Sequence, residues 1–368
     1  MKKIRVFCLL LTLCMFLSLA VGCDFINLLG NDSTDTDTDD TTESESESDS
    51  ESVGDSESSS TTESNTEETT TEKDTETETD PPADDEYRVL LTSDMHYTSL
   101  SSYYGMDRDV RLQYWVNGIL DEHKRDPFDL IIILGDMSLD YWGWNGGGSY
   151  QRNPSVSDTQ KFMEKYVSQL PQDVPTIVLP GNHELYTNEK WKQITGNNRN
   201  ESFVLGENLF VMPDSFSGAI DPAYVGGGKN DSPYKAVDMT FVQAEIDKHP
   251  ECKNIFLVSH HFDLSKESNE FKNLLKTETR IVGLFSGHTH SNKAKDLGAE
   301  YNGLRIAQTG NFASYSDETV ANFSWGYRDL QISDQLIKST YIVPGDCFYI
   351  VGSKTYKSTR TFSNIVFY

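Results

Sequence analysis

The sequence predicts an α/β fold, and two regularities along the chain support this prediction. From residue 87 onward, short continuous apolar runs recur, and each is followed by a polar cluster. Runs of this length are typical of strands that are buried on both faces. Between several of these runs lie longer segments whose apolar residues fall on one helical stripe. Strands that alternate with helices indicate a layered α/β domain.

Five apolar runs are the predicted core strands, and three segments are predicted helices. The strands cover residues 88–92 (RVLLT), 130–134 (LIIIL), 176–179 (TIVL), 254–259 (NIFLVS) and 281–286 (IVGLFS). The helices cover residues 109–124, 156–170 and 236–248. After Gly303 the chain becomes β-rich, and we expect its further strands to complete a second sheet: residues 304–309, 327–332, 335–343 and 361–367.

The N-terminal residues are typical of a bacterial export signal. Three basic residues among the first five precede an apolar run over residues 6–21, which is short for a membrane span of about 20 residues. The run ends in Leu19-Ala20-Val21-Gly22-Cys23, which resembles a lipobox except that Leu19 stands one place early. We therefore expect a signal peptide over residues 1–22, a lipid anchor at Cys23 and an extracellular protein held at the membrane. An ordinary cleaved signal peptide is the alternative.

The segment that follows is a predicted spacer. Residues 24–86 contain 24 Asp and Glu against one Lys, with Ser and Thr making up most of the remainder. Such a composition cannot bury enough apolar surface to offset the entropy of ordering, so we expect a disordered linker. A neutral flexible chain of this length spans about 40 Å, and charge repulsion lengthens it.

Residues 87–368 form the predicted folded domain, which is only mildly acidic. The whole chain has a formal net charge of −27, but this region has 34 acidic and 27 basic residues, a net of −7. It contains no basic cluster, so we expect no nucleic-acid partner. Only two of the five cysteines, Cys252 and Cys347, lie in this region. A disulfide and two free thiols are both compatible with an exported protein. We expect a monomer.

Each of the five core strands runs directly into residues that can bind a metal ion. These are Asp94-Met95-His96, Gly135-Asp136-Met137-Ser138-Leu139-Asp140, Gly181-Asn182-His183-Glu184, His260-His261 and Gly287-His288-Thr289-His290. Ligands of open α/β sheets gather beyond the carboxyl ends of strands, so these segments should converge. Singly, each has an ordinary explanation, such as a helix N-cap or a turn. Five such coincidences at five strand ends favour a common site.

The order DxH, GDxxxD, GNHE, a strand-ending His and GHTH resembles the calcineurin-like metallophosphoesterases, which include purple acid phosphatases and many bacterial phosphodiesterases. The resemblance covers residues 88–311 and each motif is present. It implies a four-layer α/β/β/α sandwich of two mixed sheets. It also implies hydrolysis of a phosphomonoester or phosphodiester of a small phosphorylated substrate.

Within this resemblance, the seven predicted ligands divide into two metal sites. Two ions about 3.5–4 Å apart repel each other, so they need a shared carboxylate, for which Asp136 is the candidate. One site has Asp94, His96 and His290, and the other has Asn182, His260 and His288. Imidazole with carboxylate oxygen suits Mn, Fe or Zn better than Ca. A water between the ions would lose its proton near neutral pH and attack phosphorus.

Two further residues are predicted to act in catalysis. The resemblance places His183 beside the metals, where it stabilises transition-state charge or protonates the leaving oxygen. Asp140 is predicted to orient His183 or His96. The choice of His260 over His261 is less direct, because the family often has His-x-Pro here and this chain has Phe262. The other histidine would shape the pocket or contact the substrate.

The substrate and some alternatives stay open in the sequence. The aromatic segment 141–145 (YWGWN) and the glycine segment 225–229 (VGGGK) are candidates for substrate contact or plain surface loops. A nuclease or nucleotide pyrophosphatase would use the same site. A non-catalytic surface binding module that keeps the fold is the alternative from another class.

Overall fold

The computed structural model describes residues 86–98, 102–103, 106–139, 157–216, 232–313, 325–344, 347–351, 354–358 and 362–367. All of them belong to one of two units along the chain, Thr77–Tyr368. The predicted signal peptide and the spacer up to residue 85 lie outside the described residues, as do Asp140 and the segments 141–145 and 225–229. Among the described residues, no helix is long and apolar enough to cross a membrane.

The first of two large sheets contains the strands that open the domain and most of those that close it. Its order is β16-β13-β12-β1-β4-β5. The strands β1, β4 and β5 are parallel, whereas β12, β13 and β16 run antiparallel to their neighbours. The bounds are β1 (Tyr87–Thr92), β4 (Leu130–Ile133), β5 (Thr176–Val178), β12 (Tyr327–Ile332), β13 (Ile337–Ile342) and β16 (Phe362–Val366).

The second sheet is also mixed and has the order β10-β11-β9-β8-β7-β6. Its four central strands are parallel, and an antiparallel strand closes each edge. The bounds are β6 (Glu201–Leu205), β7 (Asn208–Met212), β8 (Asn254–Ser259), β9 (Ile281–Ser286), β10 (Ala294–Asp296) and β11 (Arg305–Gln308). Two short pairs stand apart: β2 (Ser102–Tyr103) with β3 (Met106–Asp107), and β14 (Cys347–Val351) with β15 (Lys354–Ser358).

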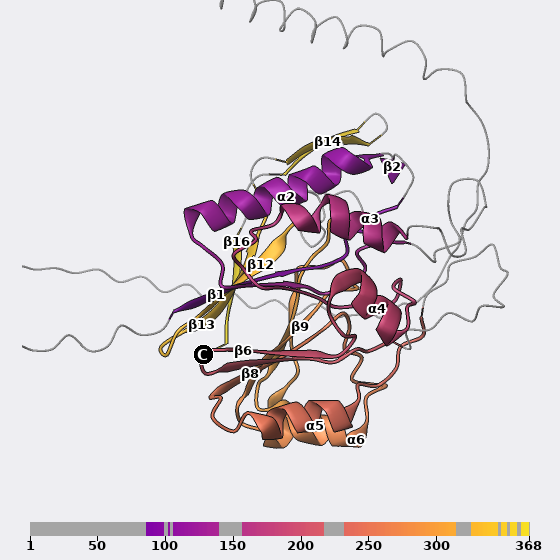
Figure 1. Cartoon of the computed structure of the whole chain (residues 1–368). Coiled ribbons are helices and arrows are strands. Elements are labelled where there is room, and N and C mark those ends of the chain that lie inside the picture. The colour runs from indigo at the N-terminus through magenta and orange to yellow at the C-terminus, as the bar shows by residue number, and fades with distance from the viewer. Residues whose placement is uncertain are drawn as a thin grey trace, which may run out of the picture. The chain divides into compact units, whose positions relative to one another are not determined.

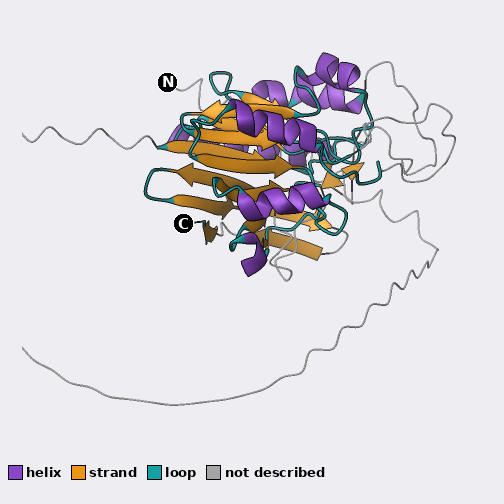
Figure 2. Ribbon diagram, turned by 90° about the horizontal axis from the view of Figure 1, so that it is seen from below, coloured by secondary structure: helices purple, strands orange, loops and turns teal. Residues whose placement is uncertain are grey.

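Helices cover the outer face of each sheet (Figures 1 and 2). They are α2 (Arg108–Arg125), α3 (Asp158–Lys165), α4 (Asn188–Thr195), α5 (Met239–Lys248) and α6 (Asn269–Thr277), with 3-10 turns at Val167–Gln169 and Ala299–Tyr301. Each α-helix begins after an Asp, Ser or Thr whose side chain accepts a backbone N–H of the first turn. Such caps satisfy donors that the helix leaves free and define where it starts.

Three apolar layers separate the four layers of secondary structure. On β1, Leu90 packs toward α2, whereas Val89 and Leu91 pack between the two sheets. Successive side chains of a strand point to opposite faces, so a strand covered on both faces is apolar throughout. The third layer lies between the second sheet and the helices α5 and α6. The predicted four-layer α/β/β/α sandwich of two mixed sheets is confirmed.

The expectation that the C-terminal strands complete a second sheet is wrong in part. Only β11 joins the second sheet, beside β9, while β12, β13 and β16 extend the first sheet. The pairing of β12 with β1 places Leu330 and Ile332 between the sheets. It also places Asp329 against Arg88, with Nε–Oδ1 and Nη2–Oδ2 distances of 3.0 and 2.9 Å. A buried pair of this kind needs both partners, so it disfavours other positions for β12.

The layer between the sheets can be tested through Phe256, which is fully buried and stacks on Phe210 with 4.9 Å between ring centroids. We expect Phe256→Ala to lower the free energy of unfolding by about 3–5 kcal/mol, because it removes apolar contacts and leaves a cavity. Urea denaturation measures this change. Val110→Ala is the control, since Val110 is 68% exposed and should change stability by less than about 0.5 kcal/mol. An equal loss of stability in the two variants would contradict the burial of Phe256 in a core between the sheets.

Candidate metal centre

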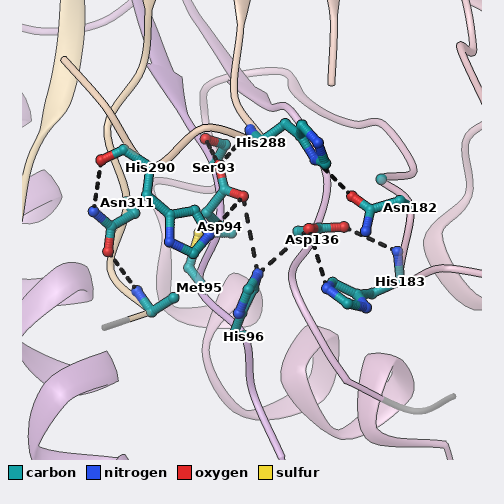
Figure 3. A network of polar contacts seen from close by, with 12 residues as sticks. Ser93, Asp94, Met95, His96, Asp136, Asn182, His183, His288, His290 and Asn311 are labelled. Atoms are coloured by element: carbon teal, nitrogen blue, oxygen red, sulfur yellow. Dashed lines mark hydrogen bonds and ion pairs between the residues drawn. The ribbon is translucent and has the colours of Figure 1, made fainter. Parts of the chain in front are cut away.

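The seven predicted metal ligands meet at one edge of the two sheets. Asp94 and His96 follow β1, Asp136 follows β4 and Asn182 follows β5, all in the first sheet. His260 follows β8, and His288 and His290 follow β9, in the second sheet. The parallel pairing within each sheet brings these carboxyl ends together. Figure 3 shows side chains from both sheets pointing toward one another.

Asp94, His96 and His290 form the first group. Asp94 Oδ1 lies 3.4 Å from His290 Nε2 and 3.9 Å from His96 Nε2. One ligand atom from each residue lies within 4.8 Å of the others. The Asp94 carboxylate is fully buried, and Ser93 Oγ and the His288 backbone N–H donate to its other oxygen. Oδ1 itself accepts no hydrogen bond, so it is free to bind an ion in the group.

Asn182, His260 and His288 form the second group. Asn182 Oδ1 lies 3.0 Å from His260 Nε2 and 2.9 Å from His288 Nδ1. His260 is 1% exposed, and its other ring nitrogen lies 2.7 Å from the carbonyl oxygen of Leu134. That carbonyl contact orients the ring and leaves Nε2 facing the group. An imidazole held in this way by a backbone carbonyl is typical of metal-ligating histidines.

Asp136 lies between the two groups. Its Oδ2 is 3.4 Å from His96 Nε2 in the first group and 3.3 Å from His260 Nε2 in the second. The other oxygen, Oδ1, accepts the backbone N–H of His183 at 3.0 Å. One carboxylate oxygen therefore faces both groups while the other is held by the loop (Figure 3). This is the position that a shared ligand of two ions requires.

The backbone at these ligands is strained. Among the residues described, six non-glycine positions have a positive φ, and five of the six are predicted ligands. They are Asp94 (58°), His96 (46°), Asp136 (49°), His288 (67°) and His290 (56°). Each such conformation costs about 1–3 kcal/mol and persists only where the surroundings enforce it. This strained backbone directs the side chains of both motif residues after β1, and of both after β9, toward the site.

Close backbone approach explains two of the glycines in the motifs. A Cβ on Gly181 would lie 2.1 Å from Asp136 Oδ1, and one on Gly287 would lie 2.5 Å from Ser93 Oγ. Neither distance is possible for real atoms, so both positions need glycine. The GN and GH pairs of the sequence therefore have a steric basis in the site itself.

Glu184 braces the loops that hold Asp136. Its Oε2 accepts the backbone N–H groups of Asp136 (2.8 Å) and Gly181 (2.7 Å), and its Oε1 accepts that of Ser138 (3.0 Å). The side chain is fully buried. It thus ties the loop after β4 to the loop after β5.

Two further supporting residues were not singled out in the sequence. Asn311 donates from Nδ2 to the carbonyl oxygen of His290 (2.9 Å). Arg111, a fully buried guanidinium of α2, donates to the carbonyl oxygens of Met95 and Phe312. The sequence contains a signal for Asn311, because the pair Gly310-Asn311 follows a strand as Gly181-Asn182 does. A helix interior offers no comparable signal for Arg111.

The electrostatics of the cluster are those of close acid–imidazole pairs. Burial opposes ionisation of Asp136, but the charges of His260 and His183 outweigh it and hold its pKa well below the usual range. Burial likewise opposes protonation of His260, yet the Asp136 carboxylate raises its pKa to about 9. Burial lowers the pKa of His96 to about 4. Burial and the nearby Asp136 charge raise the pKa of Glu184 to about 8.

These residues fit divalent metal ions. The buried Asp94 Oδ1 has no hydrogen-bond donor, and the His and Asp atoms of each group lie within ligand reach of one another. Carboxylate, amide and imidazole donors together suit Mn, Fe or Zn. A third combination, His96 with Asp136 and His183, also lies within this reach. Loading the protein with metal would give the number and identity of the ions. A His183 variant would tell whether His183 binds one of them.

The two ambiguous histidines occupy different places. His183 lies beside Asp136, with 3.6 Å between its Nε2 and Asp136 Oδ2, and its ring meets that of His96 edge to face. The ring of His261 packs against Tyr234 and lies 4.5 Å from the His288 ring. His260, rather than His261, therefore faces both Asp136 and Asn182. Asp140 lies outside the described residues, so its predicted role stays a prediction.

Comparison with known proteins agrees with this geometry. The chain matches the calcineurin-like phosphoesterase family over residues 87–292, which is more than half of its length. All seven predicted ligands lie within the matched region.

Solved structures similar to this chain include a phosphatase and a predicted phosphoesterase. A dimetal phosphatase from Danio rerio is 13% identical and aligns over 67% of this chain and 95% of its own, with a TM-score of 0.46. A protein of Streptococcus pneumoniae described as a predicted phosphoesterase is 12% identical, over 74% and 99%, with a TM-score of 0.31. Zinc-bound Vps29 of Entamoeba histolytica is 12% identical, over 76% and 99%, with a TM-score of 0.32. The fold assignment rests on the sheets and the family match.

The choice between the adjacent histidines leads to a direct test. We expect His260→Ala to lose bound metal, because Nε2 of His260 faces both Asn182 and Asp136. His261→Ala should keep the wild-type metal content, since that ring packs on Tyr234 instead. Elemental analysis after dialysis measures the ions per chain. A variant lacking His261 that loses an ion while the His260 variant keeps it would reverse the assignment.

Substitution of Glu184 should destabilise the loops after β4 and β5 without removing a metal ligand. In Glu184→Gln, the amide nitrogen would face at least one of the backbone N–H groups that the carboxylate now accepts. We expect the free energy of unfolding to fall by about 1–3 kcal/mol, the cost of buried donors left without acceptors. Thermal denaturation measures this. The exposed Glu164→Gln on α3 is the matched control, and an equal loss there would exclude the bracing role.

Proposed function

This chain belongs to the calcineurin-like phosphoesterase family, and we propose that it hydrolyses small phosphomonoesters or phosphodiesters with the help of two metal ions. Membership makes it a metal-dependent phosphoester hydrolase and favours an enzyme over the alternative of a non-catalytic binding module. One observation supports a dinuclear site above all others. The Asp136 carboxylate oxygen lies 3.4 and 3.3 Å from imidazoles of two separate ligand groups.

The seven side chains would divide between the ions as the contacts divide them. Asp94, His96 and His290 would hold one ion; Asn182, His260 and His288 would hold the other; Asp136 would contact both. Bound divalent ions of this kind polarise phosphoryl oxygens and lower the pKa of a bound water. Mn, Fe and Zn are the proposed candidates because the donors are imidazole and oxygen.

His183 is proposed as the residue that acts on the leaving group. Its backbone N–H is held by Asp136 Oδ1 at 3.0 Å, and its Nε2 lies 3.6 Å from Asp136 Oδ2. His183 is 7% exposed, so it is buried beside the cluster. From there it can donate a proton to the departing oxygen or stabilise the charge that develops on it. Asp140 is proposed, from its spacing alone, to orient His183 or His96.

A small substrate is favoured over a nucleic acid. The catalytic domain, residues 87–368, has a net charge of −7 and no cluster of basic residues in its sequence. Binding to a phosphate backbone depends on such clusters. A nuclease is therefore the weaker alternative on the same site, while a nucleotide pyrophosphatase needs no basic track and differs only in the leaving group.

We also propose that the enzyme acts outside the cell, tethered to the membrane at Cys23 as a monomer. The support is the sequence Leu19-Ala20-Val21-Gly22-Cys23 after an apolar run, followed by an acidic spacer to residue 86. A spacer of this length would hold the catalytic domain about 40 Å from the anchor.

Two substitutions test the dinuclear mechanism together. We expect Asp136→Asn to lose both metal and turnover of aryl phosphate mono- and diesters, because the amide gives up the charge that both groups share. His183→Gln should keep its metal while kcat falls by about 10²–10⁴-fold, the usual contribution of a general acid. Steady-state kinetics and elemental analysis on protein loaded with Mn or with Fe and Zn measure both.

The controls separate catalysis from folding. Circular dichroism should show that both variants keep the wild-type secondary structure. If wild-type protein loaded with these ions hydrolyses no aryl phosphate mono- or diester, or retains no transition metal, the proposed function is wrong. If His183→Gln loses an ion, His183 is a ligand instead of a proton donor.

The tether leads to a separate expectation. Wild-type protein expressed in a bacterium that processes lipoproteins should sediment with membranes and take up radiolabelled fatty acid. Cys23→Ala should appear in the soluble exported fraction without label, because the site of lipid attachment is gone. Equal labelling of both proteins would contradict an anchor at Cys23.

A further inference from the structure

The turn between α5 and β8 gathers three side chains with metal-ligand chemistry, far from the catalytic site. His249, Glu251 and Cys252 each offer one such atom, and the three atoms all lie within 4.8 Å of one another. His249 Nδ1 and Glu251 Oε1 are 3.0 Å apart. Imidazole, carboxylate and thiol on one turn form a combination that the catalytic mechanism does not use.

The turn is held in shape by backbone contacts. The Cys252 N–H donates to the carbonyl oxygen of His249 (3.3 Å), which brings the first and last of the three residues together. Arg280, just before β9, donates from Nη1 to the carbonyl oxygens of both His249 (3.1 Å) and Cys252 (3.4 Å). The Arg280 charge is paired with Glu278, with Nε–Oε1 and Nη2–Oε2 distances of 3.0 and 2.8 Å. The three side chains therefore project from a braced turn.

The three residues differ in burial, and their exposure increases from Cys252 to His249 to Glu251. Cys252 is 1% exposed and carries a free thiol, so it is not in the disulfide with Cys347 that the sequence left open. The His249 side chain is 19% exposed and that of Glu251 is 62% exposed. Burial first, and then the Glu251 charge, hold the pKa of the Cys252 thiol above its ordinary value. Without an ion, this residue is a protonated thiol.

We propose that His249, Glu251 and Cys252 form a third metal site, which binds one Zn²⁺ or a similar borderline divalent ion with water as the fourth ligand. Nitrogen, sulfur and oxygen donors of this kind are those that Zn²⁺ prefers in four-coordinate sites. Cys252 closes the site from the core side, and the exposed side of Glu251 leaves room for the water. The ion displaces the thiol proton when it binds.

The distances agree with such a site. With Zn–N and Zn–O bonds of about 2.0–2.1 Å and a Zn–S bond of about 2.3 Å, neighbouring ligand atoms of a tetrahedron stand roughly 3.3–3.6 Å apart. The His249–Glu251 pair at 3.0 Å is already near this separation, and the Cys252 thiol lies within 4.8 Å of both, a gap that side-chain rotation can close. The ordinary alternative is a surface hydrogen bond between His249 and Glu251 with an unrelated buried thiol.

The third site is separate from the catalytic centre. Cys252 precedes β8 (Asn254–Ser259), and His260 follows it, so the strand lies between the two sites. At about 3.3 Å per residue, they are roughly 25 Å apart. The ion would fasten the end of α5 to the start of β8. This function is structural and independent of phosphoester hydrolysis.

Cobalt provides the test, because a cysteine thiolate bound to Co²⁺ absorbs in the near ultraviolet and the catalytic ligands include no thiolate. The full chain is stripped of metal, reduced and titrated with Co²⁺. We expect this absorption in the wild type, and its loss in Cys252→Ser together with one bound ion per chain. Turnover of aryl phosphate by the Zn- or Mn-loaded variant should stay within about twofold of wild type, because the catalytic ligands are untouched.

Two further variants guard against a folding defect. His249→Ala alters a half-buried side chain and leaves the thiol in place, so it should weaken the cobalt absorption without disturbing the core. Cys347→Ser is the matched cysteine control and should keep it. The proposal is overturned if the wild type shows no such absorption, if the absorption survives in Cys252→Ser, or if Cys347→Ser alone removes it. None of these outcomes bears on the catalytic metals.

Discussion

The buried carboxylate of Asp136 is the interaction on which the rest of the site depends. Asp136 is 2% exposed, and its Oδ2 lies within 3.6 Å of imidazole nitrogens of His96, His183 and His260, which follow three different strands. A charge taken out of water costs several kcal/mol unless opposite charges compensate it. The histidines supply this compensation, and bound cations would supply more. The position is therefore stable only when the loops after β1, β5 and β8 are all in place.

The strained backbone follows from the same requirement. Five predicted ligands occupy the left-handed region, each at a cost of about 1–3 kcal/mol. The surrounding structure enforces these conformations by contacts that have little to do with metal binding. Glu184 accepts three backbone N–H groups, and Arg111 donates to the carbonyl oxygens of Met95 and Phe312. The strained ligand positions destabilise the fold, and the hydrogen bonds of Glu184 and Arg111 stabilise it. This explains why this carboxylate and this guanidinium are fully buried there.

The site also depends on how the two sheets pack. Asp94, Asp136 and Asn182 come from the first sheet, whereas His260, His288 and His290 come from the second. Each ligand group thus combines residues of both sheets, and the apolar layer between the sheets, where Phe210 stacks on Phe256, sets how closely they approach each other. Close-packed interiors resist small displacements, so this layer holds the two halves of the site in register. The proposed third metal site lies beyond the opposite end of β8 and belongs to the second sheet alone.

The sequence by itself indicated the strands and the ligand motifs that follow them, and its resemblance to a known family predicted the division of the ligands into two groups. This was possible because apolar periodicity, glycine turns and the ligand motifs are local. The tertiary structure decided what depends on distant partners. It placed β12, β13 and β16 in the first sheet, and it revealed the short elements α4, α6, β6 and β7 in addition to the predicted ones. It separated His260 from His261, because adjacent residues point in different directions and only burial tells which one faces Asp136. The support by Arg111 and Asn311 likewise joins segments about 200 and about 20 residues apart, and no local pattern encodes such contacts.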